Sequence, residues 1–200
     1  MDVASWNNRY AAPQYIYGET PNVFVAEMAS QIPAGPVLCL AEGEGRNAVH
    51  LATLGHRVTA VDQSEAGLAK ARRLATTRAV EIETVLADLE NFTIKAGVWA
   101  GIIATFAHLP PAIRRKVHAQ AVGGLRPGGV FVLEGYTPAQ LAFDTGGPKS
   151  PERLMTLADL RDELAGLELL VGREIEREMI EGEGHNGRGA VVQILARQHE

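Results

Sequence analysis

The chain has 200 residues, of which 46% are hydrophobic and 22% are charged, a balance typical of one globular domain over residues 1–200. A net charge of −5 without a run of Lys and Arg excludes binding to nucleic acid mainly through phosphates, so the expected partner is a small molecule. Cys39 is the single cysteine, which excludes an intramolecular disulfide, and no metal site is expected. Because the sequence has neither an apolar leader nor a membrane-length apolar run, we expect a cytoplasmic monomer or homodimer without membrane contact.

The first half of the chain alternates short apolar runs with helical patterns. Val37–Ala41 is predicted as a strand, and the glycines after it lead into a helix that ends at Gly55. Arg57–Asp62 is predicted as a second strand, and Ser64 as the N-cap of the next helix. Val80–Leu86 alternates apolar and acidic residues, which is typical of a half-exposed edge strand.

The second half begins in the same way. Val98–Thr105 is nearly all apolar, which predicts a central parallel strand, and Pro111 suits the first turn of a helix. A fifth strand is predicted over Val130–Gly135. Tyr136–Met155 contains three prolines and no clear period, which predicts a substrate loop.

The chain closes with a helix and two strands. Thr156 and Asp159 have the spacing of a capping box at a helix start. The strands Leu169–Ile180 and Ala190–Ala196 are predicted as an antiparallel pair joined by a glycine-rich turn over Glu181–Gly189. Together the elements predict an α/β fold, a doubly wound and mostly parallel seven-stranded Rossmann-like sheet with a C-terminal antiparallel hairpin.

The turn after the first strand carries the most informative motif. Gly43 and Gly45 allow the backbone to approach a ligand closely where a helix begins. Asp62 follows at the end of the next strand, at the spacing of an acid that accepts hydrogen bonds from a ribose diol. The combination predicts an adenosine ligand.

Two kinds of protein compete for this pattern. The sequence Gly43-x-Gly45-x-x-Ala48 also satisfies the dinucleotide fingerprint, so an NAD(P)-dependent oxidoreductase is an alternative. The chain is short for a substrate domain of the usual kind, and it ends in an antiparallel pair. Asp88 closes the third strand with a carboxylate that suits an adenine amino group. A cofactor-binding module without turnover is a further alternative.

Short motifs are spread along the chain in a fixed order. They are Trp6-x-x-Arg9-Tyr10, Tyr17-Gly18-x-x-Pro21-Asn22, Glu44-Gly45-Arg46-Asn47-Ala48, Val61-Asp62-x-Ser64, Ala87-Asp88-Leu89, His108-Leu109-Pro110, Leu125-x-Pro127-Gly128-Gly129 and Gly187-Arg188. On these segments, over essentially its whole length, the chain resembles the class I S-adenosylmethionine-dependent methyltransferases, and among them the tellurite-resistance-type and thiopurine-methyltransferase-like proteins.

The resemblance implies methyl transfer to a small acceptor, such as a chalcogen oxyanion, a thiol or a small metabolite. Gly43 and Gly45 would then lie under the methionine moiety, Asp62 would hold the ribose, and Asp88 with the Leu89 amide would frame the adenine. The full set of expected cofactor contacts is Arg9, Tyr17, Glu42, Gly43, Gly45, Arg46, Asn47, Asp62, Gln63, Asp88, Leu89 and Phe106. The chain departs from the family at Cys39, where an acid is usual, and Glu42 is the candidate replacement.

The acceptor side is expected to use residues from strand ends and the terminal hairpin. Candidates for catalysis are His108, Tyr136, His185 and Arg188. Each has a structural alternative, since a loop histidine is often solvated and Arg188 can pair with a glutamate. Glu174–Glu183 is expected to be a solvated edge.

The aromatic N-terminal segment is the expected lid over the cofactor. Residues 1–35 are predicted as lid and helix, in which an aromatic face suits a sulfonium cation. Trp6 can equally be a hydrophobic anchor.

Overall fold

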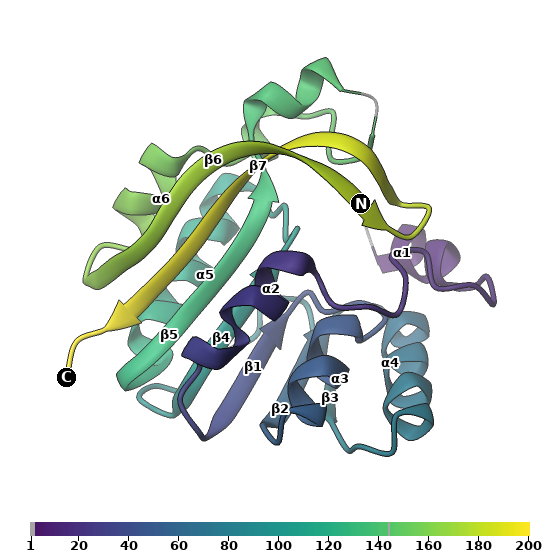
Figure 1. Cartoon of the computed structure of the whole chain (residues 1–200), viewed down its shortest axis with the longest axis horizontal. Coiled ribbons are helices and arrows are strands. Elements are labelled where there is room, and N and C mark those ends of the chain that lie inside the picture. The colour runs from purple at the N-terminus through teal and green to yellow at the C-terminus, as the bar shows by residue number, and fades with distance from the viewer. Residues whose placement is uncertain (1–2, 144) are drawn as a thin grey trace.

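The computed structural model describes residues 3–143 and 145–200, and in it seven strands form one sheet with the order β3-β2-β1-β4-β5-β7-β6 (Figure 1). The first five strands pair in parallel, and β7 is antiparallel to both of its neighbours. The predicted α/β fold and its terminal hairpin are therefore confirmed. The strands are β1 (Pro36–Leu40), β2 (Arg57–Asp62), β3 (Glu83–Leu86), β4 (Trp99–Thr105), β5 (Leu125–Tyr136), β6 (Leu167–Glu181) and β7 (His185–Gln198).

Helices cover both faces of the sheet. On one face α2 and α3 bury Phe24 and Leu51 against sheet residues such as Val132, and on the other α5 and α6 bury Val117 and Leu160. The central strands are apolar on both faces because both are covered. The helices are α1 (Val3–Tyr10), α2 (Val23–Met28), α3 (Arg46–Thr53), α4 (Glu65–Thr77), α5 (Pro111–Gly124) and α6 (Leu157–Glu163), with 3-10 helices at Ala29–Gln31, Pro138–Ala142 and Pro151–Arg153.

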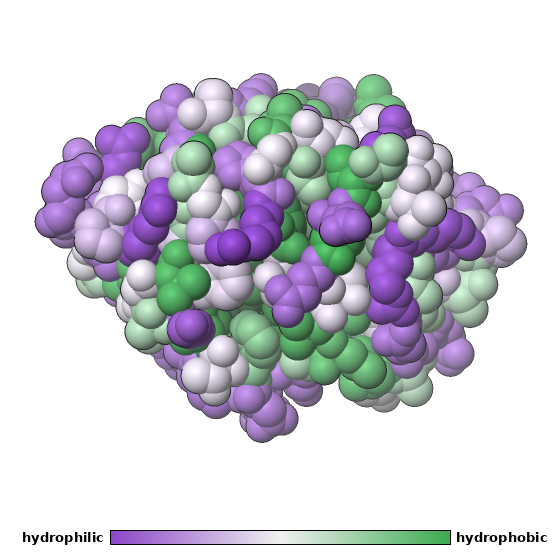
Figure 2. Space-filling view, turned by 90° about the horizontal axis from the view of Figure 1, so that it is seen from below, coloured by the Kyte–Doolittle hydropathy of each residue, from purple (hydrophilic) through white to green (hydrophobic). Residues whose placement is uncertain are grey.

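The parallel strands place their carboxyl ends at one edge of the sheet. Asp62 at the end of β2 pairs in register with Leu86 at the end of β3, and Thr105 of β4 pairs with Glu134 of β5. Loops that leave these ends therefore meet at the same edge, where ligands of open α/β sheets bind. At the opposite end, seen from below in Figure 2, small hydrophobic groups lie between hydrophilic side chains.

The terminal hairpin differs from the prediction. Its strands reach Glu181 and His185, so the turn is three residues long and does not extend to Gly189. The later glycines serve packing, because a Cβ on Gly189 would lie 2.5 Å from the Met179 methyl carbon and one on Gly187 would lie 2.9 Å from Thr145. His185 and Arg188 consequently lie in strand β7, where His185 is buried and Arg188 is exposed.

Two further boundaries shift. β3 begins at Glu83, since the backbone N–H of Val80 closes the end of α4 by bonding to Ala75. β5 begins at Leu125, earlier than Val130.

The expected substrate loop, Tyr136–Met155, contains two 3-10 helices. Gln140 fixes its path: the side-chain amide donates to the Gly146 carbonyl, and its oxygen accepts the Ala190 N–H. Asp144, within this loop, and residues 1–2 of the expected lid lie outside the described residues.

Across residues 3–143 and 145–200, no helix has the length and apolar character required to cross a membrane.

Candidate functional site

The loop between β1 and α3, residues 41–45, turns sharply at the carboxyl edge. Ala41, Gly43 and Gly45 all have positive φ, at 50°, 61° and 91°. Glycine adopts this conformation without strain, whereas alanine pays about 1 kcal/mol for it. Gly45 must also be small, because a Cβ there would lie 2.5 Å from the Cβ of Ala71 in α4. The two glycines predicted from the sequence are thus needed by this loop, which we call the cofactor loop.

Glu42 is buried inside the cofactor loop. Its carboxylate accepts hydrogen bonds of 2.9 and 2.8 Å from the backbone N–H groups of Asn47 and Ala48, in the first turn of α3. Burial raises the pKa of Glu42 to about 7, against the lowering effect of these N–H groups. Burial and the neighbouring Glu42 also raise the pKa of the Cys39 thiol. The carboxylate of Glu42 therefore lies beside Cys39, although strand β1 itself carries no acid. In the described structure the same carboxylate caps the start of helix α3.

Asp62 closes the cofactor loop from the end of β2. Its two carboxylate oxygens accept hydrogen bonds of 2.8 Å from the N–H groups of Gly43 and Ser64. Burial raises its pKa against the effect of these donors. Beside it in the sheet, the apolar Leu86 is 56% exposed. An acid, a glycine loop and an exposed apolar side chain at one edge fit a ligand with a ribose and a flat base.

The adenine end of the expected site is more open. The exposed Asp88 accepts the N–H of Glu90 through its carboxylate, while the Leu89 side chain is buried and Gln63 is half-buried. Asp88 therefore has capacity for a further hydrogen bond.

Three polar side chains of the cofactor loop and α3 hold the N-terminal segment. Glu44 pairs with Lys70 at 2.6 Å and accepts the N–H of Tyr17, whose carbonyl accepts from Arg46. Asn47 accepts the N–H of Asn22. Arg46 and Asn47, expected to contact the cofactor, thus have structural partners in the described residues.

Helix α1 lies across the cofactor loop. A Cβ on Gly43 would lie 2.6 Å from the hydroxyl of Tyr10, which is buried. Asn7 accepts hydrogen bonds from the Ser64 hydroxyl and the Ala66 N–H at the start of α4. Arg9 donates to the Tyr17 hydroxyl at 2.7 Å. This position agrees with a lid, and its motion stays a prediction.

Five rings extend from this lid to the end of β5. The ring centroid of His185 lies 4.5 Å from that of Tyr17 and 4.2 Å from that of Phe106. Phe106 lies 4.8 Å from Tyr136, which stacks on His108 at 5.5 Å. We call these five residues the aromatic row. It brings together three predicted acceptor residues and two predicted cofactor contacts.

His108 has no free ring nitrogen. Its Nδ1 bonds to the Arg153 carbonyl at 3.0 Å, and its Nε2 accepts the Tyr136 N–H at 3.2 Å. Burial lowers its pKa to about 4. Tyr136 is fully buried, and burial raises the pKa of its phenol. The geometry therefore makes His108 a neutral structural group, and Tyr136 remains protonated near neutral pH.

His185 differs from His108. It is 6% exposed, and its buried Nδ1 has no hydrogen-bond partner among the described residues. The nearest acid is Glu181, with 3.9 Å between Nδ1 and Oε2. Burial lowers the pKa of His185, opposed by this carboxylate. A buried imidazole with unused hydrogen-bonding capacity is a candidate for chemistry.

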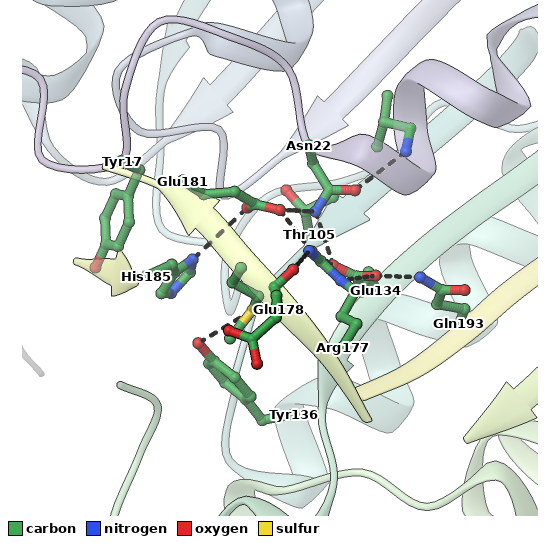
Figure 3. A network of polar contacts seen from close by, with 12 residues as sticks. Tyr17, Asn22, Thr105, Glu134, Tyr136, Arg177, Glu178, Glu181, His185 and Gln193 are labelled. Carbon is green, nitrogen blue, oxygen red and sulfur yellow. Dashed lines mark hydrogen bonds and ion pairs between the residues drawn. The ribbon is translucent and has the colours of Figure 1, made fainter. Parts of the chain in front are cut away.

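A buried charged network lies beside His185, one member of the aromatic row (Figure 3). Glu181 pairs with Arg46 and Arg177, and Arg177 also pairs with Glu134. Asn22 donates to both glutamates. The expectation of a solvated edge over Glu174–Glu183 is therefore wrong for Arg177 and Glu181. Met179, between them on the same face of the strand, is the sequence signal that this face is buried.

Arg188 lies on the other side of the hairpin. It is exposed and pairs with Glu176, with 2.7 Å between the guanidinium and the carboxylate. The structure does not bring it to the aromatic row. The described part of the chain also contains no group of three or more His, Cys, Asp or Glu residues that could hold a metal.

Comparison with known families identifies the core of the chain. Residues 37–129, from β1 to the turn inside β5, match the family model of a methyltransferase domain. This part of the chain is similar to methyltransferase domains. The match implies an enzyme that uses S-adenosylmethionine as its cofactor, and it favours methyl transfer over the oxidoreductase alternative. No curated protein matches the chain.

Solved structures share the fold at low identity. A protein studied for the conversion of a disulfide bond into a thioacetal group during echinomycin biosynthesis has a TM-score of 0.81 and 19% identity, over 98% of this chain and 91% of its own. An S-adenosylmethionine-dependent methyltransferase from Anabaena variabilis has a TM-score of 0.74 and 17% identity, over 98% and 93%. TehB from Haemophilus influenzae has a TM-score of 0.66 and 20% identity, over 98% and 66%. At these identities the likeness concerns the fold.

Proposed function

We propose that this methyltransferase domain methylates a small molecule that binds against the aromatic row. The observation that carries the proposal is the position of Tyr17. Its backbone N–H is held by Glu44 of the cofactor loop and its carbonyl by Arg46, the first residue of α3, while its ring contacts His185. One residue therefore joins the proposed cofactor site to the proposed acceptor site. Methyl transfer needs this proximity, because alignment of the two reactants is the enzyme's main contribution.

Bound S-adenosylmethionine supplies an electrophilic methyl group on its sulfonium. In our proposal Asp62 accepts from the ribose hydroxyls, the glycine backbone underlies the methionine moiety, and Asp88 with the Leu89 amide meets the adenine. The lid excludes water, with Tyr10 and Tyr17 as its inner surface.

His185 is the proposed proton acceptor. It is neutral near pH 7 because burial lowers its pKa, so it can take a proton. The imidazole of His185 would accept the proton of the acceptor, which would leave the acceptor with the electron pair that bonds to the methyl carbon. The cofactor would supply that methyl group, and its sulfur would keep the electron pair of the carbon–sulfur bond that is broken. His108 is not proposed for this step, because both of its nitrogens have backbone partners.

A neutral thiol is the acceptor class that we favour. The arginines behind the aromatic row already pair with carboxylates: Arg46 with Glu181, and Arg177 with Glu134 and Glu181. An oxyanion acceptor requires a cation with free hydrogen bonds, whereas a thiol requires an apolar surface and a base. The similar protein of echinomycin biosynthesis is likewise associated with sulfur chemistry. The sequence resemblance to tellurite-resistance-type proteins, which stays a prediction, favours an oxyanion instead and defines the competing arm of the test.

The test is a methyl-transfer screen that measures formation of S-adenosylhomocysteine. It compares small thiols, small phenols and chalcogen oxyanions, each with the parent protein and with His185→Gln. We expect thiols to be the best acceptors and the variant to lose at least tenfold in kcat. Turnover with oxyanions alone would overturn the acceptor class, and binding of the cofactor without turnover on any acceptor would favour a binding module.

A further inference from the structure

The carboxylate of Glu181, the last residue of β6, is at the centre of the charged network although sequence patterns place it on a solvated edge. It is 2% exposed. Its oxygens lie 2.7 Å from the Arg46 guanidinium and 3.1 Å from the Asn22 amide, and they also pair with Arg177. A buried carboxylate with this many donors is fixed in position.

His185 lies directly across the hairpin turn from this carboxylate. The distance of 3.9 Å from its Nδ1 to Glu181 is longer than a hydrogen bond, and Nδ1 has no other partner among the described residues. Figure 3 shows the imidazole between Glu181 and the ring of Tyr17. A movement of about 1 Å would form a charge-assisted hydrogen bond.

We propose that Glu181 is the positioning residue of His185, and that Arg46 connects this pair to the cofactor loop. Glu181 accepts the Nδ1–H, which leaves Nε2 as the unprotonated nitrogen for the acceptor. The same arrangement of carboxylate and imidazole fixes the tautomer of histidines in other enzymes. The catalytic meaning of this pair rests on the proposed function, while its geometry does not.

The connection through Arg46 follows from its place in the chain. Arg46 is the first residue of α3, directly after Gly45, and its guanidinium bridges Glu181 and the Tyr17 carbonyl. A change in the cofactor loop therefore displaces the cation that holds the carboxylate. By thermodynamic linkage, if cofactor binding shifts the pKa of His185, protonation of His185 changes the affinity for the cofactor by the corresponding factor.

The charges that face His185 come from every neighbouring element. They are Glu181 and Arg177 from β6, Arg46 from α3, Glu134 and the Tyr136 phenol from β5, the Tyr17 phenol from the N-terminal segment, and the His108 imidazole from the loop after β4. The charges of the two glutamates and the two arginines sum to zero. Removing one glutamate therefore makes the electrostatic potential at His185 more positive, and removing one arginine makes it more negative.

The test is the pKa of His185, measured by NMR titration of the whole protein without cofactor. Glu181→Gln removes a negative charge and should lower this pKa by about 0.5–1, and Arg46→Gln removes a positive charge and should raise it by a similar amount. Glu181→Asp should restore part of the loss. Glu176→Gln is the matched control, because Glu176 is in the same strand and pairs with Arg188 on the exposed face.

Opposite signs for the first two variants, with no change in the control, support the proposal. The proposal is overturned if the pKa of His185 is the same in all variants. It is also overturned if Glu181→Gln and Arg46→Gln move this pKa in the same direction. If Glu181→Gln does not fold, Arg46→Gln alone decides by its sign, because it leaves the pair of Glu181 with Arg177 in place. These outcomes do not depend on methyl transfer, so a failure of the proposed function in the acceptor screen is seen separately.

Discussion

The backbone N–H of Gly43 donates a 2.8 Å hydrogen bond to the carboxylate of Asp62, across 19 residues of sequence. The acid at the end of β2 thus shapes the loop that is proposed to lie under the cofactor. Its second oxygen accepts from Ser64, directly before α4. Asp62 is therefore both a proposed ligand contact and a structural link between two loops.

Replacing Asp62 by Ala should affect binding and stability together. We expect binding of S-adenosylhomocysteine to weaken by ~1–3 kcal/mol, because the ribose hydroxyls lose a charged acceptor. The free energy of unfolding should fall by a similar ~1–3 kcal/mol, because two N–H groups lose their partner. Calorimetry and thermal unfolding measure the two effects. Asp88→Ala is the control, since its exposed carboxylate should matter for binding only.

The hairpin turn should be sensitive to a single methyl group. A Cβ on Gly182 would lie 2.3 Å from the Ile16 carbonyl, so Gly182→Ala should release the lid and destabilise the protein. Gly97→Ala is the matched control: its φ of +65° is close to the +70° of Gly182, but nothing lies within 4 Å. We expect the control to lose about 1 kcal/mol from backbone strain and Gly182→Ala to lose more. Equal losses, with unchanged hydrogen exchange in residues 14–18, would show that the turn does not hold the lid.

Protonation of His108 should make stability depend on pH. Its pKa is lowered to about 4 from an ordinary value of 6.5, so the unfolded chain binds more protons between these values. The stability that the neutral ring contributes is present above pH 6.5 and is lost as the pH falls toward 4. His108→Ala should lower the free energy of unfolding at pH 7 by ~1–3 kcal/mol and flatten this dependence. The control is His199→Ala, at an exposed position, which should leave the dependence of the free energy of unfolding on pH unchanged. If this dependence were as steep in His108→Ala as in the parent protein, the structural role of His108 would be contradicted.

Closure of the lid predicts a change in hydrogen exchange. Residues 14–18 are anchored by backbone bonds to the cofactor loop, Lys70 and the hairpin, whereas α1 is held through Asn7 and Tyr10. We therefore expect S-adenosylhomocysteine to increase protection in α1 first, and Tyr136–Met155 to respond mainly to the acceptor. Unchanged exchange in both segments would indicate a preformed site.

Local features of this chain could be predicted from the sequence, and tertiary neighbours could not. The place of Gly43, Gly45 and Asp62 at one ligand-binding edge can be predicted, because the strand-turn-helix pattern that contains them spans only about 20 residues. The contact between Phe106 and His185 joins residues 79 positions apart and depends on the pairing of β5 with β7.

The misjudged strand β6 shows the same limit. Its alternating charges predict a solvated edge, but residues 16–22 lie over its end and bury Glu181. The glycines of the hairpin predict a long turn, but two of them make room for neighbouring side chains. In both cases the cause is a tertiary neighbour: a segment more than 100 residues earlier lies over Glu181, and the side chains of Thr145 and Met179 lie beside the two glycines.

The most direct test of the account is calorimetric titration of the whole protein with S-adenosylhomocysteine and, separately, with NADH. We predict one binding site for S-adenosylhomocysteine with a Kd of roughly 1–100 µM, weaker binding in Asp62→Ala, and no heat from NADH. Binding of NADH with no response to S-adenosylhomocysteine would contradict it.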